Sequence, residues 1–376
     1  MAAGLSKPGL ARLEEALHRR IEAGHIPGAV GMILRDGVPV WQRAFGRRDP
    51  AATAPMPEDA IFRIYSMTKP IVSVAAMTLW EEGHFLLSDP VARFIPEFAE
   101  VRLASGAAPA RPITVQDLLR HTSGLTYEFR GSGPVQAAYV AARIARRNQT
   151  NAEQAVTLAG LPLLHPPGTH WEYSRSTDVL GRVVEVIAGE PLGAFLARRI
   201  LAPLGMTDAG FHVPAAALGR LAEAFPTDPD SGAPVALLEV REPPRFESGG
   251  GGMVASTADY GRFLAMLLGE GALDGARILG RKTLALMTAD HLGGLPAAED
   301  LLPPGHGFGL GFAVRLAPGL APFPGSVGSY FWGGLAGTTF WVDPAERLAA
   351  VLMIQAPGQR ETYRLLFRSL VYAALE

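Results

Sequence analysis

The chain has 376 residues, of which 48% are hydrophobic and 19% are charged. This composition is ordinary for a packed globular enzyme, excludes a disordered chain and, at about 150 residues per domain, suggests roughly two domains. The formal net charge of -2 offers no basic field for nucleic acid or an anionic membrane, so we expect neither as a partner. The lack of cysteine excludes disulfides and cysteine metal sites.

The first predicted element is an amphipathic helix over residues 10–22. Leu10, Leu13, Leu17 and Ile21 recur at helical spacing, and acidic residues stand where a signal peptide would be apolar. No apolar run of the sequence approaches the about 20 residues that a membrane-spanning helix needs. These features predict a cytoplasmic protein.

Two strand-like runs follow, at 28–34 and 38–46, and the turn Arg35-Asp36-Gly37 between them predicts a hairpin. The chain therefore opens with a helix and a hairpin before it reaches its first unusual motif.

That motif is Ser66-Met67-Thr68-Lys69, in a chain whose only lysines are Lys7, Lys69 and Lys282. Arginine cannot lose its proton in a protein, whereas a desolvated lysine can become neutral and accept one. Residues three apart share a helix face, so the Lys69 amine can reach the Ser66 hydroxyl. Ser66 and Lys69 are therefore a candidate nucleophile and base.

The flanking sequence places Ser66 at the start of a buried helix. Apolar residues dominate from Ile71 to Trp80, and Pro70 is tolerable only near a helix start because it lacks an N–H. The free N–H groups there would stabilise an oxyanion and help to lower the pKa of Lys69.

Residues 93–209 contain mostly helical segments broken by proline and glycine. The predicted helices are 115–119, capped by Thr114, then 135–144 and 176–187. A helical insertion into an α+β domain explains this pattern. We therefore expect a discontinuous sheet domain of residues 1–92 and 210–376, a helical domain of residues 93–209, and an active site in the cleft between them.

A second polar motif, Tyr173-Ser174-Arg175, lies on a loop just before the helix 176–187. On its own, Tyr173 would be an interfacial tyrosine with a packed ring and a hydrated hydroxyl. Asp178 fits a first-turn acid favoured by the helix dipole. His121 fits a hydrogen-bonded structural residue, and the nine histidines show no metal spacing, so we expect no metal.

The glycine run 249–252 lacks the Lys-Ser/Thr that a phosphate loop would carry, so it predicts a tight turn lining the cleft, followed by a helix capped at Ser256 or Thr257. A third motif, Tyr330 to Gly337, is strand-like but interrupted by glycines, which permit close approach of a backbone or a ligand. Alone it predicts a bulged edge strand. A second hairpin, 338–342 with 348–354, precedes a helix from about 361 to 375, and both chain ends should join one antiparallel sheet.

Taken together, the three motifs resemble those of serine hydrolases of the β-lactamase and penicillin-recognising superfamily. Ser66-x-x-Lys69 matches the nucleophile motif, Tyr173-Ser174-Arg175 stands where these proteins carry Tyr-x-Asn, and Trp332-Gly333-Gly334 stands where they carry Lys-Thr-Gly. The resemblance covers nearly the whole chain. The closest pattern is that of family VIII carboxylesterases, which look like class C β-lactamases but have Trp-x-Gly in place of Lys-Thr-Gly.

The resemblance implies a β-lactamase-like fold, an antiparallel sheet flanked by helices with an inserted helical domain, and no cofactor. The residues it implies are Ser66, Lys69 and Tyr173 for catalysis, the N–H groups of Ser66 and Leu335 for an oxyanion hole, and Trp332, Gly333, Gly334, Arg175 and Tyr127 for substrate binding.

Two departures from the lactamase pattern carry chemical weight. Trp332 cannot supply the charge with which the lysine of Lys-Thr-Gly holds a substrate carboxylate, so a neutral, apolar acyl or alcohol group is expected. Arg175 replaces the asparagine that recognises the amide side chain of lactams. It is either a charge beside Tyr173 or an exposed cation where the helix begins.

These residues predict hydrolysis of short-chain carboxylic esters, as small-molecule substrates, through an acyl-Ser66 intermediate. The base is either a neutral Lys69 or a Tyr173 phenolate stabilised by cationic Lys69, and the sequence does not choose between them. Alternatives are an acyltransferase that uses the same acyl-enzyme, a β-lactamase or D,D-peptidase-like activity, and a non-catalytic binding protein on this fold.

Overall fold

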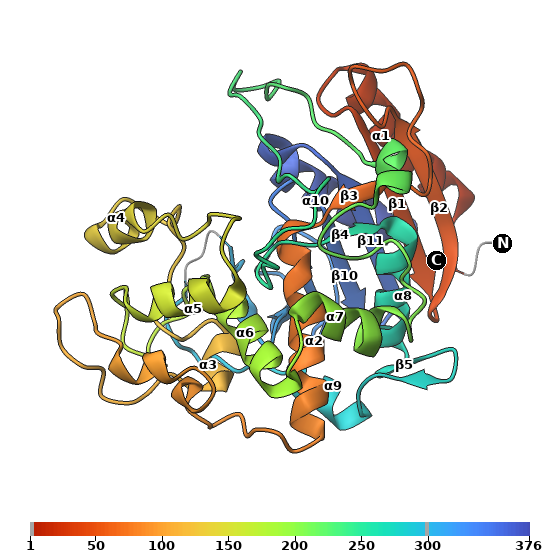
Figure 1. Ribbon diagram of the computed structural model, residues 1–376. Coiled ribbons are helices and arrows are strands. Elements are labelled where there is room, and N and C mark those ends of the chain that lie inside the picture. Colours follow the sequence, from red (N-terminus) through yellow and green to blue (C-terminus); the bar gives the residue numbers. More distant parts are fainter. Residues whose placement is uncertain (1–3, 298–300) are drawn as a thin grey trace.

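A seven-stranded antiparallel sheet organises the chain (Figure 1), whose computed structural model describes residues 4–297 and 301–376. Its strands are β1 (Gly28–Arg35), β2 (Val38–Gly46), β7 (His306–Phe308), β8 (Ala313–Arg315), β9 (Tyr330–Gly333), β10 (Thr339–Asp343) and β11 (Leu348–Ile354). They lie in the order β2-β1-β11-β10-β9-β8-β7. Because β1 pairs with β11, the two ends of the chain share this sheet, as the sequence predicts.

The helices of the described residues lie on both faces of the sheet and beside it. They are α1 (Lys7–Glu22), α2 (Thr68–Glu81), α3 (Val115–Leu119), α4 (Pro134–Ala141), α5 (Asn151–Ala159), α6 (Ser176–Ala188), α7 (Leu192–Leu196), α8 (Thr257–Leu268), α9 (Arg281–Met287) and α10 (Arg360–Tyr372). None of these helices is long and apolar enough to cross a lipid bilayer.

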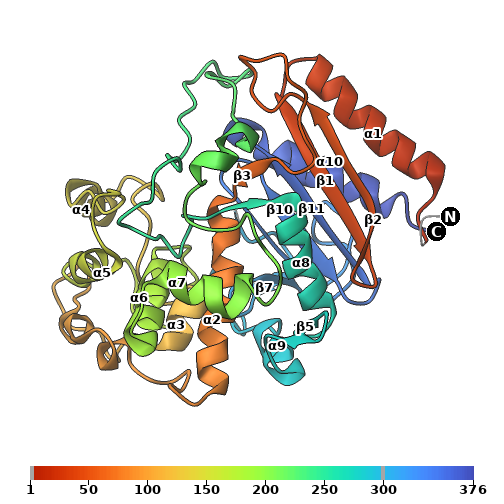
Figure 2. The ribbon, with the colours of Figure 1, turned by 45° about the vertical axis from the view of Figure 1, so that its right-hand side comes forward.

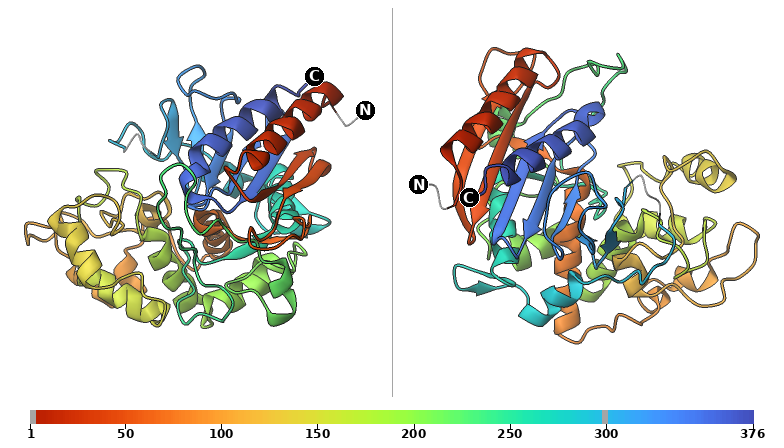
Figure 3. Two further views of the ribbon diagram at one scale, coloured as in Figure 1. Left: turned by 90° about the horizontal axis from the view of Figure 1, so that it is seen from above. Right: turned by 180° about the vertical axis from the view of Figure 1, so that it is seen from behind.

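Alternation of side chains along β1 explains why helices cover both faces. Ala29 and Ile33 point into an apolar cluster with α1 and α10, whereas Val30 and Met32 point into a larger one that includes α2 and α8. Figure 3 shows α1 and α10 side by side on their face. Both faces of β1 are buried, and its sequence carries no polar side chain before Arg35.

Two short strand pairs complete the sheets: β3 (Ile61–Arg63) with β4 (Val254–Ser256), and β5 (Ala272–Leu273) with β6 (Ala276–Arg277). Strand β3 leads into a 3₁₀ turn, Tyr65–Met67, and then directly into α2. Helix α2 is buried from Thr68 to Leu79, which confirms the predicted buried helix and places Ser66 in the turn just before it.

Helices α3 to α6 lie beside α2, on the side away from α1 (Figures 1 and 2). The predicted helices at 115–119, 135–144 and 176–187 are confirmed as α3, α4 and α6, with α4 ending earlier, at Ala141. Thr114 and Asp117 form a capping box that starts α3. The division into a helical domain of residues 93–209 and a discontinuous sheet domain stays a prediction.

The expectation of an edge strand at Tyr330 to Gly337 is wrong. Strand β9 covers only Tyr330–Gly333 and lies between β10 and β8, inside the sheet. The short strands β7 and β8, which the sequence did not predict, extend the sheet beyond it.

Candidate active site

A cavity of about 700 Å³ gathers most of the residues that the three motifs contain, and its size suits a small organic ligand. Its lining includes Ser66, Tyr127, Tyr173, Arg175, Trp332, Gly333 and Leu335. Lys69, which is 1% exposed, lies behind this lining. The glycine turn also lines the cavity through residues 250–252, as the sequence predicts. Five segments that are distant in the sequence therefore converge on one site.

The residue before the nucleophile has an unusual backbone. Tyr65 has φ of 44°, a region that side chains other than glycine rarely adopt. Its hydroxyl accepts a hydrogen bond of 2.8 Å from the N–H of Leu238, which helps to hold this conformation. The turn presents Ser66 to the cavity while Met67 stays in the core.

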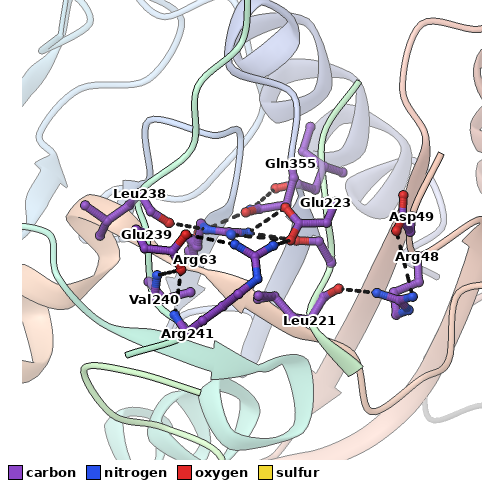
Figure 4. A network of polar contacts seen from close by, with 12 residues as sticks. Arg48, Asp49, Arg63, Leu221, Glu223, Leu238, Glu239, Val240, Arg241 and Gln355 are labelled. Atoms are coloured by element: carbon purple, nitrogen blue, oxygen red, sulfur yellow. Dashed lines mark hydrogen bonds and ion pairs between the residues drawn. The ribbon is translucent and has the colours of Figure 1, made fainter. Parts of the chain in front are cut away.

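A polar network fixes the strand that leads to Ser66 (Figure 4). The buried guanidinium of Arg63 donates to the carbonyls of Leu238 (2.5 Å) and Ala222 (2.9 Å) and forms an ion pair of 3.1 Å with Glu223. The carbonyl of Arg63 accepts from the Gln355 amide at 3.2 Å. This network ties β3 both to the loop around Leu238 and to the end of β11.

The Lys69 amine has three close neighbours. Its Nζ lies 3.3 Å from Ser66 Oγ, 2.9 Å from the Tyr127 hydroxyl and 2.5 Å from the Gly250 carbonyl. Burial lowers the pKa of Lys69 to about 7. The negative charge of Asp178 opposes this lowering, and the positive charge of Arg175 adds to it. A neutral amine has two N–H groups and one lone pair, so the carbonyl must receive one N–H while the lone pair can accept from a hydroxyl.

Tyr173 completes the catalytic candidates. Its hydroxyl bonds to Ser66 and accepts from the indole N–H of Trp332 at 3.2 Å. Burial raises the pKa of Tyr173 to about 12, although both hydrogen bonds oppose the shift. The Lys69 amine also lies 4.5 Å from the centre of its ring. Near neutral pH this tyrosine is therefore a neutral phenol.

A buried carboxylate behind the site holds the glycine turn. Oδ1 of Asp178 accepts from Ser248 Oγ at 2.5 Å and from the Gly250 N–H at 2.9 Å. Since the Gly250 carbonyl accepts from Lys69, Asp178 acts on the lysine through one peptide unit. Asp178 is confirmed as an acid in the first turn of α6, and its side chain is in addition buried and bound by a distant segment.

The structure excludes one of the two interpretations of Arg175. It is 8% exposed, so it is not an exposed cation at a helix start. Its guanidinium forms ion pairs with Glu128 (2.5 Å) and Asp178 (3.2 Å) and lies 4.7 Å from the centre of the Tyr127 ring. Lys69, Gly250, Asp178, Arg175 and Tyr127 thus form a closed ring of contacts.

Tyr127 was expected to bind substrate, and it does line the cavity, yet its hydroxyl is directed to Lys69. His121 is confirmed as a hydrogen-bonded structural residue: it is buried, and its Nδ1 lies 3.2 Å from Ser174 Oγ. Sequence reasoning missed the Asp178–Gly250 contact. The sequence offered one signal for this contact: Asp178 lies at the start of a predicted helix, and Gly250 lies in the predicted glycine turn.

The end of β9 approaches the nucleophile through glycine. A Cβ on Gly334 would lie 2.4 Å from the Ile64 carbonyl and 2.2 Å from Thr338 Oγ1, so no side chain fits. This confirms the predicted close approach of another backbone. It brings Leu335 to the cavity that Ser66 lines, as an oxyanion hole built from their N–H groups requires.

Comparison with known proteins agrees with this geometry. The chain is 38% identical over 351 residues to Protein Rv1367c of Mycobacterium tuberculosis (89% of this chain, 87% of the relative). It is 35% identical over 384 residues to Esterase EstB of Burkholderia gladioli (96% and 95%). Its structure matches EstCE1, a hydrolase with promiscuous acyltransferase activity, with a TM-score of 0.83 and 30% identity over 97% of this chain and 99% of the other.

The resemblance inferred from the three motifs is thus confirmed by whole-length similarity. The family model described as Beta-lactamase matches residues 11–373. The chain belongs to the beta-lactamase family, and its similarity to EstB and EstCE1 groups it with the esterases of that family.

Proposed function

We propose that this protein is a carboxylesterase of the family VIII type that hydrolyses short-chain esters through an acyl-enzyme on Ser66. The observation that carries the proposal is the Lys69 amine, with a pKa of about 7, placed 3.3 Å from Ser66 Oγ. The similarity to EstB and EstCE1 supports ester hydrolysis as the reaction.

In the first half-reaction, Ser66 Oγ attacks the ester carbonyl while the neutral Lys69 amine takes its proton. The carbonyl oxygen becomes an oxyanion held by the N–H groups of Ser66 and Leu335. Tyr173, a neutral phenol bonded to Ser66, donates a proton to the departing alkoxide and recovers one from Lys69. The products are the acyl-Ser66 ester and a free alcohol.

Water then occupies the place of the alcohol, and the same groups act in reverse. Tyr173 and Lys69 remove a proton from the water as it attacks the acyl carbonyl, and Ser66 leaves with a proton. Of the two candidate bases, Lys69 is favoured. Burial lowers the pKa of Lys69 to about 7, so its neutral form is accessible near neutral pH, whereas burial raises the pKa of Tyr173 and disfavours its phenolate.

Acyl transfer is the second candidate, since EstCE1 is described as a hydrolase with promiscuous acyltransferase activity. An alcohol or amine would then capture the acyl group in place of water. Measuring ester and acid products in the presence of a competing alcohol separates the two outcomes.

Mass spectrometry of the intact protein tests the proposal. After incubation with a short 4-nitrophenyl ester or a serine-directed phosphonate, we expect an adduct on the wild type and none on Ser66→Ala. kcat/KM should also be higher for a short 4-nitrophenyl ester than for a chromogenic cephalosporin. An absent adduct would favour a non-catalytic binding protein, and a preferred cephalosporin would favour a lactamase. The cytoplasmic location stays a prediction.

A further inference from the structure

The cavity that contains Ser66 is lined by several arginines. They are Arg130, Arg147, Arg175, Arg360 and Arg364. No aspartate or glutamate of residues 4–297 and 301–376 belongs to this lining. Apolar side chains supply much of the remaining wall, among them Phe129, Leu238, Phe246 and Phe331. The cavity thus combines an apolar interior with cationic groups.

Carboxylates outside the lining form ion pairs with four of these arginines. The ion pairs are Arg130 with Glu172 (3.8 Å), Arg175 with Glu128 (2.5 Å) and Asp178 (3.2 Å), and Glu361 with Arg364 (2.8 Å) and Arg360 (3.3 Å). Each of these four arginines therefore has a carboxylate partner, although Arg360 and Arg364 share Glu361.

Arg147 is different. It has no hydrogen bond or ion pair with any other residue of the described ranges, and its Nη2 is buried without a partner. Burial lowers the pKa of Arg147. Glu239 opposes this shift from a distance, but its carboxylate is bonded to Arg241 at 2.9 Å. Arg147 is partly buried, and its buried Nη2 donor without an acceptor is costly unless a ligand supplies one.

The loop that carries Arg147, between α4 and α5, is fixed on both sides of this residue. The buried Gln149 amide donates to the carbonyls of Ile144 (2.8 Å) and Arg146 (2.9 Å). Arg245 donates to the Asn148 carbonyl at 3.0 Å, next to Phe246 in the cavity wall. The position of Arg147 is therefore set by the fold.

Arg147 lines the same cavity as Ser66 and interacts electrostatically with Tyr65. Burial raises the pKa of Tyr65, the residue directly before Ser66, and the charge of Arg147 is one of the groups that oppose this rise. The cation comes from the helical part of the chain and Tyr65 from the turn before α2, so the two face one cavity from different segments. A ligand that spans them would have its ester at Ser66 and an anion at Arg147.

We propose that the preferred substrate is an anionic ester, an apolar chain that carries a carboxylate and binds it to Arg147. This inference rests on the proposed function, and it assigns the charge that Trp332 cannot supply to a residue outside the three motifs. The carboxylate receives the unpartnered guanidinium N–H groups, and the apolar walls cover the chain between carboxylate and ester.

Two matched pairs of esters test the proposal. One pair places the charge in the alcohol half, 4-acetoxybenzoate against its methyl ester. The other places it in the acyl half, 4-nitrophenyl hydrogen adipate against 4-nitrophenyl methyl adipate. After division by each ester's hydroxide-catalysed rate, kcat/KM should favour the anion by about 10-fold or more in one pair, the range of a hydrogen bond to a charged group.

Arg147→Met should abolish most of that preference. Arg146→Met is the matched control, because it removes the same charge from the neighbouring position, which does not line the cavity; its preference should equal that of the wild type. The proposal is wrong if neither pair favours the anion, or if the preference survives in Arg147→Met.

A binding measurement separates this inference from the proposed function. Hexanoate should raise the melting temperature of the wild type more than hexanamide does, and this difference should vanish in Arg147→Met but not in Arg146→Met. If the protein hydrolyses none of the esters, the proposed function fails while this measurement still decides whether Arg147 binds a carboxylate. Equal shifts with hexanoate and hexanamide would overturn the anion site.

Discussion

At the scale of one residue, burial sets the pKa of Lys69 and hydrogen bonds set the position of its amine. Its scarcity as a lysine and its spacing from Ser66 were visible in the sequence. Its other two neighbours, Tyr127 and Gly250, were not, because they are 58 and 181 residues away along the chain. Spacing predicts contacts within one turn of a helix, whereas these contacts require the tertiary fold.

Replacement of Lys69 tests whether the amine acts as a base or as a charge. Lys69→Arg keeps a cation but cannot give up a proton, so we expect kcat to fall by about 10²–10⁴-fold. Lys69→Met, which is apolar, should be equally inactive, and melting curves should show that both variants fold. If Lys69→Arg stays within a few-fold of the wild type while Lys69→Met is inactive, the lysine acts by charge and Tyr173 is the base.

The pH dependence follows from the same residue. The base must be neutral, and the neutral fraction of Lys69 rises as pH increases through its pKa of about 7. The acid limb of kcat/KM against pH should therefore have an apparent pKa near that value. A profile that is flat between pH 6 and 8 would contradict the assignment of Lys69 as the base.

At the scale of elements, the start of α6 and the glycine turn are joined by Asp178. The sequence predicted both elements, and it predicted a cap of α8 at Ser256 or Thr257, of which the structure has Ser256. It could not predict that a first-turn carboxylate would turn inward, because an acid there is equally favourable in water. Inward orientation is decided by the Ser248 and Gly250 donors that the fold places opposite it.

Asp178→Asn should move the acid limb to lower pH. The negative charge of Asp178 raises the pKa of Lys69, and Arg175 lowers it. Removing the first effect leaves the second unopposed, so the pKa of Lys69 falls and the acid limb moves with it. Asp259→Asn is a suitable control, since Asp259 also accepts from backbone N–H groups but is not among the groups that shift the pKa of Lys69. An unchanged or raised limb in Asp178→Asn would contradict this coupling.

Strand β9 contributes both packing and a hydrogen bond through Trp332. The side chain is 5% exposed and packs against Tyr173 and Phe308, with ring centres 5.1 Å and 5.3 Å away. Trp332→Phe keeps most of this packing but removes the N–H that holds the Tyr173 hydroxyl. We expect kcat to fall about 5-fold with a small change in melting temperature.

Trp332→Ala should in addition lower the free energy of unfolding by about 3–5 kcal/mol, because it leaves a cavity in the aromatic cluster. Denaturant unfolding and steady-state kinetics on the same preparations separate the two effects. An unchanged kcat in Trp332→Phe would show that Tyr173 is held without the indole.

At the scale of the whole molecule, the sequence predicted the parts that depend on periodicity. The two hairpins, the antiparallel sheet and the helices α1, α2, α6 and α10 all follow from apolar spacing and turn residues. The sequence did not predict strands β7 and β8 because each has only three residues, and so it did not predict that β9 lies inside the sheet. Arg147 escaped because nothing in its local sequence distinguishes it from Arg146.

The outer layer of α1 and α10 offers a test of stability apart from catalysis. Leu17 is fully buried in the cluster between α1 and the sheet. Leu17→Ala should lower the free energy of unfolding by about 2–5 kcal/mol. Since Leu17 lies on the sheet face that α2 does not cover, kcat/KM of the folded protein should match the wild type. A large loss of kcat/KM at full folding would show that the outer layer positions the site.

The contact of Gly334 with the Ile64 carbonyl has a consequence for how this cavity can change. The backbone at Gly334 packs directly against the backbone at Ile64, and Thr338 Oγ1 donates to the Ile64 carbonyl at 3.3 Å. The distance between the N–H groups of residues 66 and 335 is therefore set without the side chain of Leu335, which is 46% exposed. Position 335 is free to vary in size and polarity, so new substrate preferences can arise there while the machinery for the oxyanion stays as it is.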